Sequence, residues 1–485
     1  MAKPSQHRVV AHHLSFLPPR STCVKTTISA ETKGDVATMK SFIEYPNDHP
    51  FSIHNLPYGS FYTNQDASSR RCGVAIGGCI LDLQALSYTT FYPGVLPRDT
   101  FAGPTLNAFM SLDKDIWLVF RVQLQELLSK GSPINLETTI RASNAAPNVN
   151  AESHIVRPLF VDRLSEDTAM CLPCDIGDYS DFYSSLEHTY NCGVLIRGKE
   201  KAMQLNWRHL PVAYHSRASS IVPSGTPIHR PVGQKLKNKD DTQPVIEPCA
   251  RLDFELEVGF FYGGQATKLG ERLSLAQATD RVFGAFLLND WSARDIQTWE
   301  YVPLGPFLSK NFASTISPWI VPIHALETFT FPGYDHNPPL LPYLEDANNT
   351  NFDIPLTVSI KPGSASDPKE GFTTISHSSL RHTYYTIRQM IAHHSTTGCP
   401  LKPGDLLRTG TLSAPGTEGY GSLLEKCEMG KRPFKVRISR GEEVERTFIQ
   451  DGDTVKFEGT VKSSDEDWSI GFGQCVGTIL AAIPL

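Results

Sequence analysis

The segment from residue 289 to residue 315 concentrates side chains that could do chemistry. It reads NDWSARDIQTWEYVPLGPFLSKNFAST and contains Arg294, Gln297 and Lys310 among several acidic and aromatic residues. These are too many polar groups for a core segment, whereas the tryptophans and prolines make it too rigid for a solvated linker. We therefore expect its polar groups to be held in fixed positions beside a cleft.

A second acidic group lies on a segment with strand periodicity. Residues 251–260, RLDFELEVGF, alternate apolar and acidic side chains, which predicts a strand with its acids on one face. Glu255 and Glu257 would then lie side by side, roughly 7 Å apart along the chain. A solvent-facing acidic edge explains the same pattern and stays open as the alternative.

Carboxylates from separate segments could together bind a divalent cation. Mg²⁺ and Ca²⁺ are hard ions that prefer oxygen ligands, and Asp181, Glu255, Glu257 and Asp290 would form such a cage. Spacing alone does not bring them together. The chain has no GxSxG elbow, no HExxH pair and no Walker A loop, so these other common catalytic motifs do not compete.

Length and composition restrict the class of protein. At 485 residues the chain favours two domains, and a net charge of -6 gives no sign of a nucleic-acid or membrane-surface partner. The 10 cysteines are scattered, which favours reduced thiols in the cytoplasm. No apolar run reaches the length of about 18 residues that a transmembrane helix needs.

The elements that must position these residues are mostly strands. Short alternating segments begin near Phe51, and one helix is predicted within residues 105–130, with Asp113 near its start. Two more helices are predicted around residues 274–282 and 385–395. The polar segment 132–153 is a plausible hinge. We therefore expect a mainly β, α+β protein, with domains at 41–155 and 156–485.

The first 40 residues are predicted to be a disordered extension. No acidic residue precedes Glu31, while lysine and arginine alternate with serine, threonine and histidine. An organelle-targeting peptide is the alternative, but Pro18 and Pro19 interrupt any amphipathic helix there.

Several long motifs resemble the fumarylacetoacetase family. They are DIGDYSDFYSSLEH, PVAYHSRASS, LDFELE, NDWSARDIQTWEYVPLGPF, GTLSAP and GSLLE, in the family's order from about Met39 to Leu485. The resemblance implies a small N-terminal SH3-like β-barrel and a larger C-terminal mixed β-roll, assembled as a homodimer. It also implies metal-dependent hydrolysis of 4-fumarylacetoacetate to fumarate and acetoacetate, the last step of tyrosine and phenylalanine catabolism.

The resemblance also assigns roles by motif position. It implies His188 as the catalytic base with Glu425 as its carboxylate partner, and Arg294, Gln297 and Lys310 around the developing oxyanion. The implied substrate contacts are Tyr183, Arg197, Gln297, Tyr301 and Thr411. The implied ligands for Ca²⁺ or Mg²⁺ are Asp181, Glu255, Glu257 and Asp290, with Lys310 and Ser314 at a second magnesium site.

The chemistry of these side chains is consistent with the implied roles. Histidine has a pKa near neutrality and can activate water, although a structural histidine is the alternative for His188. Donors such as Arg294 can stabilise an oxyanion, or can instead form a surface ion-pair network with Asp295 and Glu300. Arg197 and Tyr183 could bind a substrate carboxylate, or pack between domains.

One departure from the family pattern lies at residues 310–314, which read KNFAS. The family commonly has threonine where this chain has Ser314, so the second magnesium site is the part of the resemblance that this position puts in doubt. Two alternatives to the implied function remain. One is another β-diketone or acylpyruvate hydrolase of the same fold, and the other is a catalytically inactive scaffold.

Overall fold

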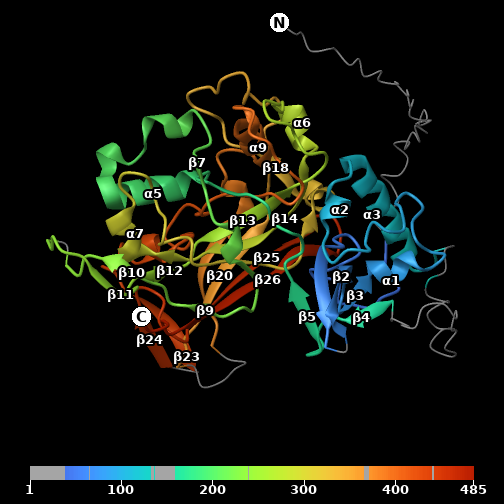
Figure 1. Cartoon of the computed structure of the whole chain (residues 1–485), viewed down its shortest axis with the longest axis horizontal. Helices are drawn as coiled ribbons and strands as arrows, with labels where there is room; N and C mark the ends of the chain where they lie inside the picture. Colours follow the sequence, from blue (N-terminus) through green and yellow to red (C-terminus); the bar gives the residue numbers. More distant parts are fainter. Residues whose placement is uncertain are drawn as a thin grey trace, which may run out of the picture. The chain divides into compact units, whose positions relative to one another are not determined.

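The computed structural model in Figure 1 describes residues 39–64, 66–132, 136, 159–238, 240–364, 371–439 and 442–485. The predicted extension at 1–40 lies almost wholly outside these residues, as does most of the predicted hinge at 132–153. Within the described residues no helix is long and apolar enough to cross a membrane.

The N-terminal part is built on a five-stranded antiparallel sheet of order β4-β3-β2-β1-β5. Its strands are β1 (Tyr58–Thr63), β2 (Asp66–Ile76), β3 (Cys79–Asp82), β4 (Phe160–Asp162) and β5 (Thr168–Cys171). The accompanying helices are α1 (Leu83–Ser87), α2 (Asn107–Met110) and α3 (Lys114–Leu128), seen beside the sheet in Figure 1. Strands β4 and β5 follow residue 156, so the chain returns to this sheet beyond the predicted boundary, which stays a prediction.

A mixed sheet of eight strands forms the centre of the C-terminal part, in the order β7-β6-β22-β13-β14-β16-β8 with β17 beside β14. Its strands are β6 (Tyr179–Phe182), β7 (Ala213–His215), β8 (Ile221–Pro223), β13 (Leu256–Tyr262), β14 (Val282–Asp290), β16 (Ser314–Ile316), β17 (Val321–Pro322) and β22 (Leu406–Arg408). The pairs β22–β6 and β16–β8 are parallel. Both faces of β13 and β14 are buried, which places these strands in the core.

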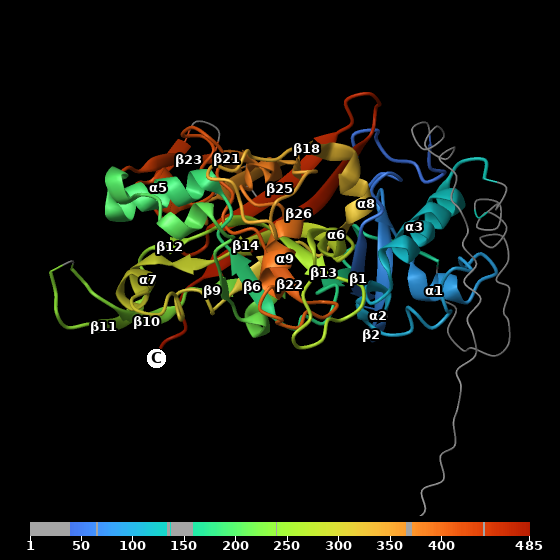
Figure 2. The same cartoon turned by 90° about the horizontal axis from the view of Figure 1, so that it is seen from above.

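A second sheet packs in the same core, in the order β21-β20-β25-β26-β9. Its strands are β9 (Ile228–His229), β20 (Pro355–Lys361), β21 (Thr373–Ser379), β25 (Thr454–Lys462) and β26 (Ser469–Leu480). The two-stranded ribbons are β10 (Val232–Lys235) with β11 (Val245–Pro248), β12 (Leu252–Asp253) with β15 (Ser292–Ala293), β18 (Thr330–Pro332) with β19 (Thr350–Phe352), and β23 (Phe434–Ser439) with β24 (Glu442–Arg446). Figure 2 shows the β10–β11 ribbon extending outward beside α7.

The C-terminal helices are α5 (Leu186–Arg197), α6 (Leu275–Thr279), α7 (Arg294–Glu300), α8 (Ile323–Leu326), α9 (Ile387–Ser395) and α10 (Leu423–Lys426). Helices α6 and α9 confirm two predictions, and each begins with a capping box, Ser274 with Gln277 and Thr386 with Gln389. Helix α3 confirms the third. The mainly β, α+β class with a small N-terminal β domain is likewise confirmed.

The predicted strand 251–260 needs correction. It is divided into β12 and β13, and Asp253, Glu255 and Glu257 are all buried, at 0%, 5% and 1% exposure. The solvent-facing acidic edge is therefore wrong. Alternation indicates that these side chains share a face, but another layer of the protein covers that face.

Candidate active site

Strand order brings the predicted carboxylates together. Strand β22 lies between β6 and β13, and β14 follows β13. In this arrangement Arg408 pairs with Asp181 in the parallel register of β22 and β6, while Asp290 pairs with Ser314 across β14 and β16. The ends of neighbouring strands therefore place acids from three distant segments close together.

Three of the acids form a compact buried cluster, which we call the carboxylate cluster: Asp181, Glu257 and Asp290. One carboxylate oxygen from each lies within 4.8 Å of the others. Asp181 Oδ1 and both oxygens of Glu257 accept no hydrogen bond, although all are buried. Burial raises the pKa of Asp181 to about 6 and the pKa of Glu257 well above its usual range. A bound cation would stabilise the ionised form of both groups and so oppose this effect of burial.

Basic side chains contact the cluster from two sides. Arg408 donates hydrogen bonds to Asp181 Oδ2 at 2.5 Å and Asp290 Oδ2 at 2.7 Å, and its Nη1 lies 3.2 Å from Glu257 Oε2. Lys310 forms ion pairs with Asp290 and with Glu255. Arg408 was not predicted. The available signal was a charged residue that directly follows the apolar pair Leu406 and Leu407.

Glu255 lies beside the cluster and is held by other partners. Its Oε1 forms a 2.8 Å ion pair with Arg294 Nη2, and Arg294 Nε donates to Asp253 Oδ2 at 2.8 Å. Burial by itself raises the pKa of Glu255, but Lys310 and Arg294 hold it below its usual range.

The charges and orphaned oxygens of this region fit a divalent cation. Arg294 balances Asp253, so four carboxylates, those of the cluster and Glu255, face two cations, Arg408 and Lys310. With all of these carboxylates ionised, two formal negative charges are left for a bound cation to compensate. Oxygen ligands of this kind suit Mg²⁺ or Ca²⁺ equally.

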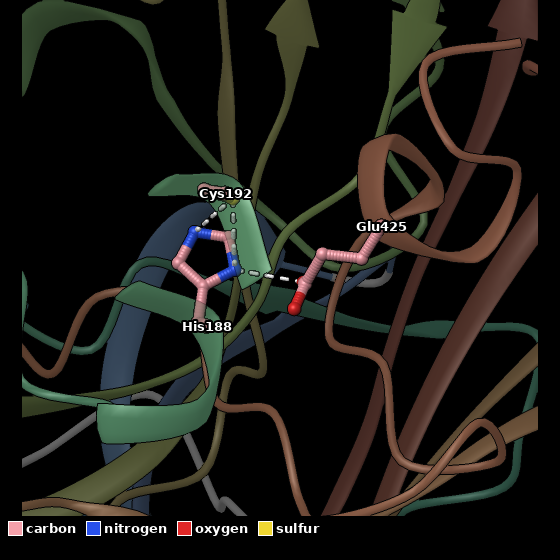
Figure 3. Close-up of side chains that lie close together, drawn as sticks. All are labelled: His188, Cys192 and Glu425. Carbon is pink, nitrogen blue, oxygen red and sulfur yellow. Dashed lines mark hydrogen bonds and ion pairs between the residues drawn. The ribbon is translucent and has the colours of Figure 1, made fainter. Parts of the chain in front are cut away.

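His188 and Glu425 form a buried pair (Figure 3). His188 lies on α5, whose N-cap Ser185 accepts from the His188 backbone N–H, and its Nδ1 lies 2.7 Å from Glu425 Oε2. Glu425 lies on α10, and α10 packs against α5. Although burial raises the pKa of Glu425, His188 holds it below its usual range. Because the carboxylate is ionised, Nδ1 must donate, which leaves Nε2 as the free base.

Three further donors hold the Glu425 carboxylate, and sequence reasoning identified none of them. Asn191 Nδ2 donates to Oε1, Ser422 Oγ donates to Oε2, and Ser413 Oγ lies 2.9 Å from both oxygens. Ser413 and Ser422 belong to the motifs GTLSAP and GSLLE, so their location was visible but their shared target was not. With every oxygen facing donors, the carboxylate has a fixed orientation.

Cys192 lies one turn beyond His188 on α5, with Sγ at 3.7 Å from Nδ1 and 3.6 Å from Nε2 (Figure 3). Burial lowers the pKa of His188, but Cys192 and Glu425 more than offset this and raise it well above the usual value. The imidazole is therefore a strengthened base. The ring also lines a cavity, which favours a chemical role over the alternative of a purely structural histidine.

A cavity of about 500 Å³ is lined both by members of the carboxylate cluster and by His188. Of the predicted site residues, those lining it are Asp181, Tyr183, His188, Arg197, Glu255, Glu257, Arg294, Gln297, Tyr301, Lys310 and Thr411. Asp290, Ser314 and Glu425 do not line it and lie behind this wall, at 1%, 3% and 2% exposure. The volume lies in the range of small-molecule sites.

Contacts around the cavity also test the alternatives that the sequence left open for Arg294 and Arg197. Arg294 does not join a surface network, because Asp295 pairs with Lys235 and Glu300 accepts from the backbone of residues 307–309. That alternative is wrong. Arg197 lines the cavity and also donates to the carbonyls of Lys201 and Ala202, so it helps to hold the turn after α5.

Ser314 keeps its hydroxyl within the site. Its Oγ donates to Asp290 Oδ1 at 3.2 Å and accepts from the Tyr179 hydroxyl at 3.1 Å. The serine therefore makes the polar contact with Asp290 without the methyl group of threonine. Its predicted part in a second magnesium site stays a prediction.

Comparison with known proteins gives matches along most of the chain. Residues 54–156 match the family described as fumarylacetoacetase N-terminal, and residues 179–480 match the family described as fumarylacetoacetate (FAA) hydrolase C-terminal. The chain is 46% identical over 449 residues to the fumarylacetoacetase of Dictyostelium discoideum, covering 92% of this chain and 99% of the relative. It is 45% identical to that of Homo sapiens, covering 91% and 99%.

Solved structures give a more distant likeness. A fumarylacetoacetate hydrolase from Exiguobacterium antarcticum is 16% identical, with a TM-score of 0.45, over 88% of this chain and 99% of that one. The sequence relatives therefore carry the assignment.

Proposed function

The chain belongs to the fumarylacetoacetate hydrolase family, and from this premise we propose that it hydrolyses 4-fumarylacetoacetate to fumarate and acetoacetate. The observation that carries the proposal is the His188–Glu425 pair, with 2.7 Å between Nδ1 and Oε2, beside a buried carboxylate cluster on the same cavity. Cleaving a carbon–carbon bond between two carbonyl groups requires a base, a stabilised oxyanion and a stabilised leaving carbanion.

His188 is the proposed base. Nδ1 donates to Glu425, so Nε2 accepts a proton from a water molecule, and the resulting hydroxide adds to the carbonyl carbon of the fumaryl group, whose bond to the adjacent CH₂ then breaks. Glu425 stabilises the imidazolium that forms and keeps the ring in the productive tautomer. The protonated ring can then supply the proton that the leaving acetoacetate carbanion needs.

Arg294, Gln297 and Lys310 are proposed to stabilise the oxyanion. Arg294 Nη1 donates to Gln297 Oε1 at 3.1 Å, so the amide group is oriented before substrate arrives. All three side chains line the cavity. A positioned donor of this kind typically contributes about 3–4 kcal/mol to the transition state.

Asp181, Glu257 and Asp290, with Glu255 beside them, would hold a Ca²⁺ or Mg²⁺ ion. Such an ion supplies Lewis-acid chemistry, polarising the diketone oxygens and stabilising an enolate. The excess of carboxylates over cations and the two Glu257 oxygens, which accept no hydrogen bond, support this role.

Tyr183, Arg197, Tyr301 and Thr411 are proposed to bind the substrate. The substrate ends in carboxylates, and a planar guanidinium binds a carboxylate through paired hydrogen bonds. Tyr183 packs edge-on against the His188 ring, with centroids 5.4 Å apart, and so bounds the reacting end of the cavity.

We also propose a cytoplasmic homodimer that acts in tyrosine and phenylalanine catabolism. The cysteines of the described residues are free thiols, which supports a reducing compartment. Leu304 and Phe307 are 96% and 64% exposed on either side of Gly305 and Pro306, which line the cavity, and such apolar surface is typical of a subunit contact. Light scattering of the purified protein would give the subunit number.

The experiment that tests the function follows the diketone absorbance of fumarylacetoacetate on addition of purified protein. We expect decay with fumarate and acetoacetate as products, loss of the decay after EDTA, and recovery with Mg²⁺ or Ca²⁺. Folded protein that leaves fumarylacetoacetate unchanged under every metal but cleaves an acylpyruvate would instead establish the second candidate, a related diketone hydrolase. Folded protein that cleaves neither would favour an inactive scaffold.

A further inference from the structure

Arg408 is fully buried and enters the carboxylate cluster from strand β22. Its guanidinium contacts all three cluster members, at 2.5 Å from Asp181, 2.7 Å from Asp290 and 3.2 Å from Glu257. The side chain is 0% exposed, and neither Nε nor Nη1 donates a hydrogen bond. Guanidinium stays protonated in proteins, so this is a permanent positive charge.

The guanidinium contacts the carboxylate oxygens that a divalent cation would need as ligands. A bound Ca²⁺ or Mg²⁺ lies about 2.0–2.6 Å from its oxygen ligands. Arg408 Nη2 already lies within hydrogen-bond distance of Oδ2 in both Asp181 and Asp290. Two cations on the same oxygens would repel each other strongly in a buried site. Full occupancy by one therefore disfavours the other.

The surroundings of Arg408 offer its guanidinium other contacts. The ring of Tyr179 lies 5.1 Å from its Cζ, and the Tyr214 hydroxyl lies 3.5 Å from Nη2. An aromatic face and a hydroxyl can retain a guanidinium that has given up a carboxylate. If the guanidinium moves toward Tyr179 and Tyr214, a divalent ion can take its place beside Asp181 and Asp290.

We propose that Arg408 is a resident counter-cation of the carboxylate cluster and competes with the divalent ion for Asp181, Glu257 and Asp290. With the ion absent, Arg408 holds the three acids together. When the ion binds, it must displace the guanidinium, so Arg408 weakens metal affinity. The inference rests on the proposed metal-binding role of the cluster.

The test measures metal binding directly, so it does not depend on turnover. EDTA-stripped wild type and Arg408→Ala are titrated with Mn²⁺, and the free ion is followed by electron paramagnetic resonance. We expect Arg408→Ala to bind Mn²⁺ at least about tenfold more tightly, because a like charge next to the ion has been removed. Its melting temperature should fall when stripped and recover with Mn²⁺, since Asp181 and Glu257 then lose their arginine partner.

Two further variants keep the result decisive. Arg408→Gln removes the charge while keeping a polar side chain with an amide donor, and it should also bind Mn²⁺ more tightly, even if Arg408→Ala does not fold. Arg446→Ala breaks another buried arginine–aspartate pair, with Asp453 and away from the cavity lining, and should leave Mn²⁺ affinity unchanged. Folded Arg408 variants that bind Mn²⁺ no more tightly than the wild type overturn the inference. Failure of hydrolysis in the diketone assay would bear on the proposed function alone.

Discussion

Replacing Glu425 with glutamine removes one negative charge from behind His188 while keeping the size of the side chain. The carboxylate is fully buried, and every contact to its oxygens is a donor: His188, Asn191, Ser413 and Ser422. Wherever the new amide points, its NH₂ group faces at least one of these donors. The variant therefore leaves polar hydrogens unsatisfied in a buried site.

Two magnitudes follow from this geometry. The mismatched donors should lower the free energy of unfolding by about 1–3 kcal/mol. Loss of the charge that stabilises the imidazolium should reduce kcat by about 10²–10⁴-fold, the range of a general base. The His188 Nε2 must be unprotonated to act, so activity falls as pH drops through the His188 pKa.

The sign of the pH effect follows from the same pair. Glu425 and Cys192 raise the pKa of His188 above its usual value against the effect of burial. In wild type the acid limb of the kcat/KM profile should therefore lie above the ordinary histidine range. Removing the Glu425 charge lowers this pKa, so in Glu425→Gln the acid limb should move to lower pH while the plateau falls.

The assay is the rate of diketone loss across pH, with urea denaturation to measure stability. Glu418→Gln is a matched control, because that glutamate side chain is 78% exposed, and it should leave both profiles unchanged. A folded Glu425→Gln protein with kcat within about threefold of wild type and an unmoved acid limb would refute the pairing of base and carboxylate.

Three other changes test separate parts of the site. Gly193→Ala would place a methyl group 1.9 Å from the Ala202 carbonyl oxygen, so the free energy of unfolding should fall by about 1–3 kcal/mol, as measured by urea denaturation. Gly103→Ala is the control and should have little effect, because the space around Gly103 is open. Lys310→Met leaves Asp290 without a cationic partner on that side and should reduce kcat at least about 10²-fold in the diketone assay; near-normal turnover would remove Lys310 from the oxyanion group. Glu300→Ala removes the acceptor for the backbone N–H groups of residues 307–309 and should raise KM more than it lowers kcat, which steady-state kinetics would measure.

The sequence predicted the helices whose ends carry local signals. Ser274 and Thr386 begin α6 and α9 through capping boxes, which need only residues three positions apart. Helix α5, which carries His188, was missed. Tyr190, Asn191 and Gly193 weaken its helical pattern, and its order depends on packing against α10 and the turn after it. Local chemistry thus determined the first two helices, and tertiary contacts determined α5.

Most of the candidate site residues also came from the sequence, because long motifs keep functional side chains at fixed positions. What the sequence left open was their partners. Alternation in 251–260 placed the acids on one face, but only the neighbouring layers decided that this face is buried and that Arg294 pairs with Asp253. Arg408 depended most on tertiary structure. Its contacts with Asp181 and Asp290 arise from the order of β6, β22, β13 and β14 in the sheet. Strands β6 and β22 are neighbours there although they lie more than 100 residues apart in the chain, and no local pattern encodes such pairing.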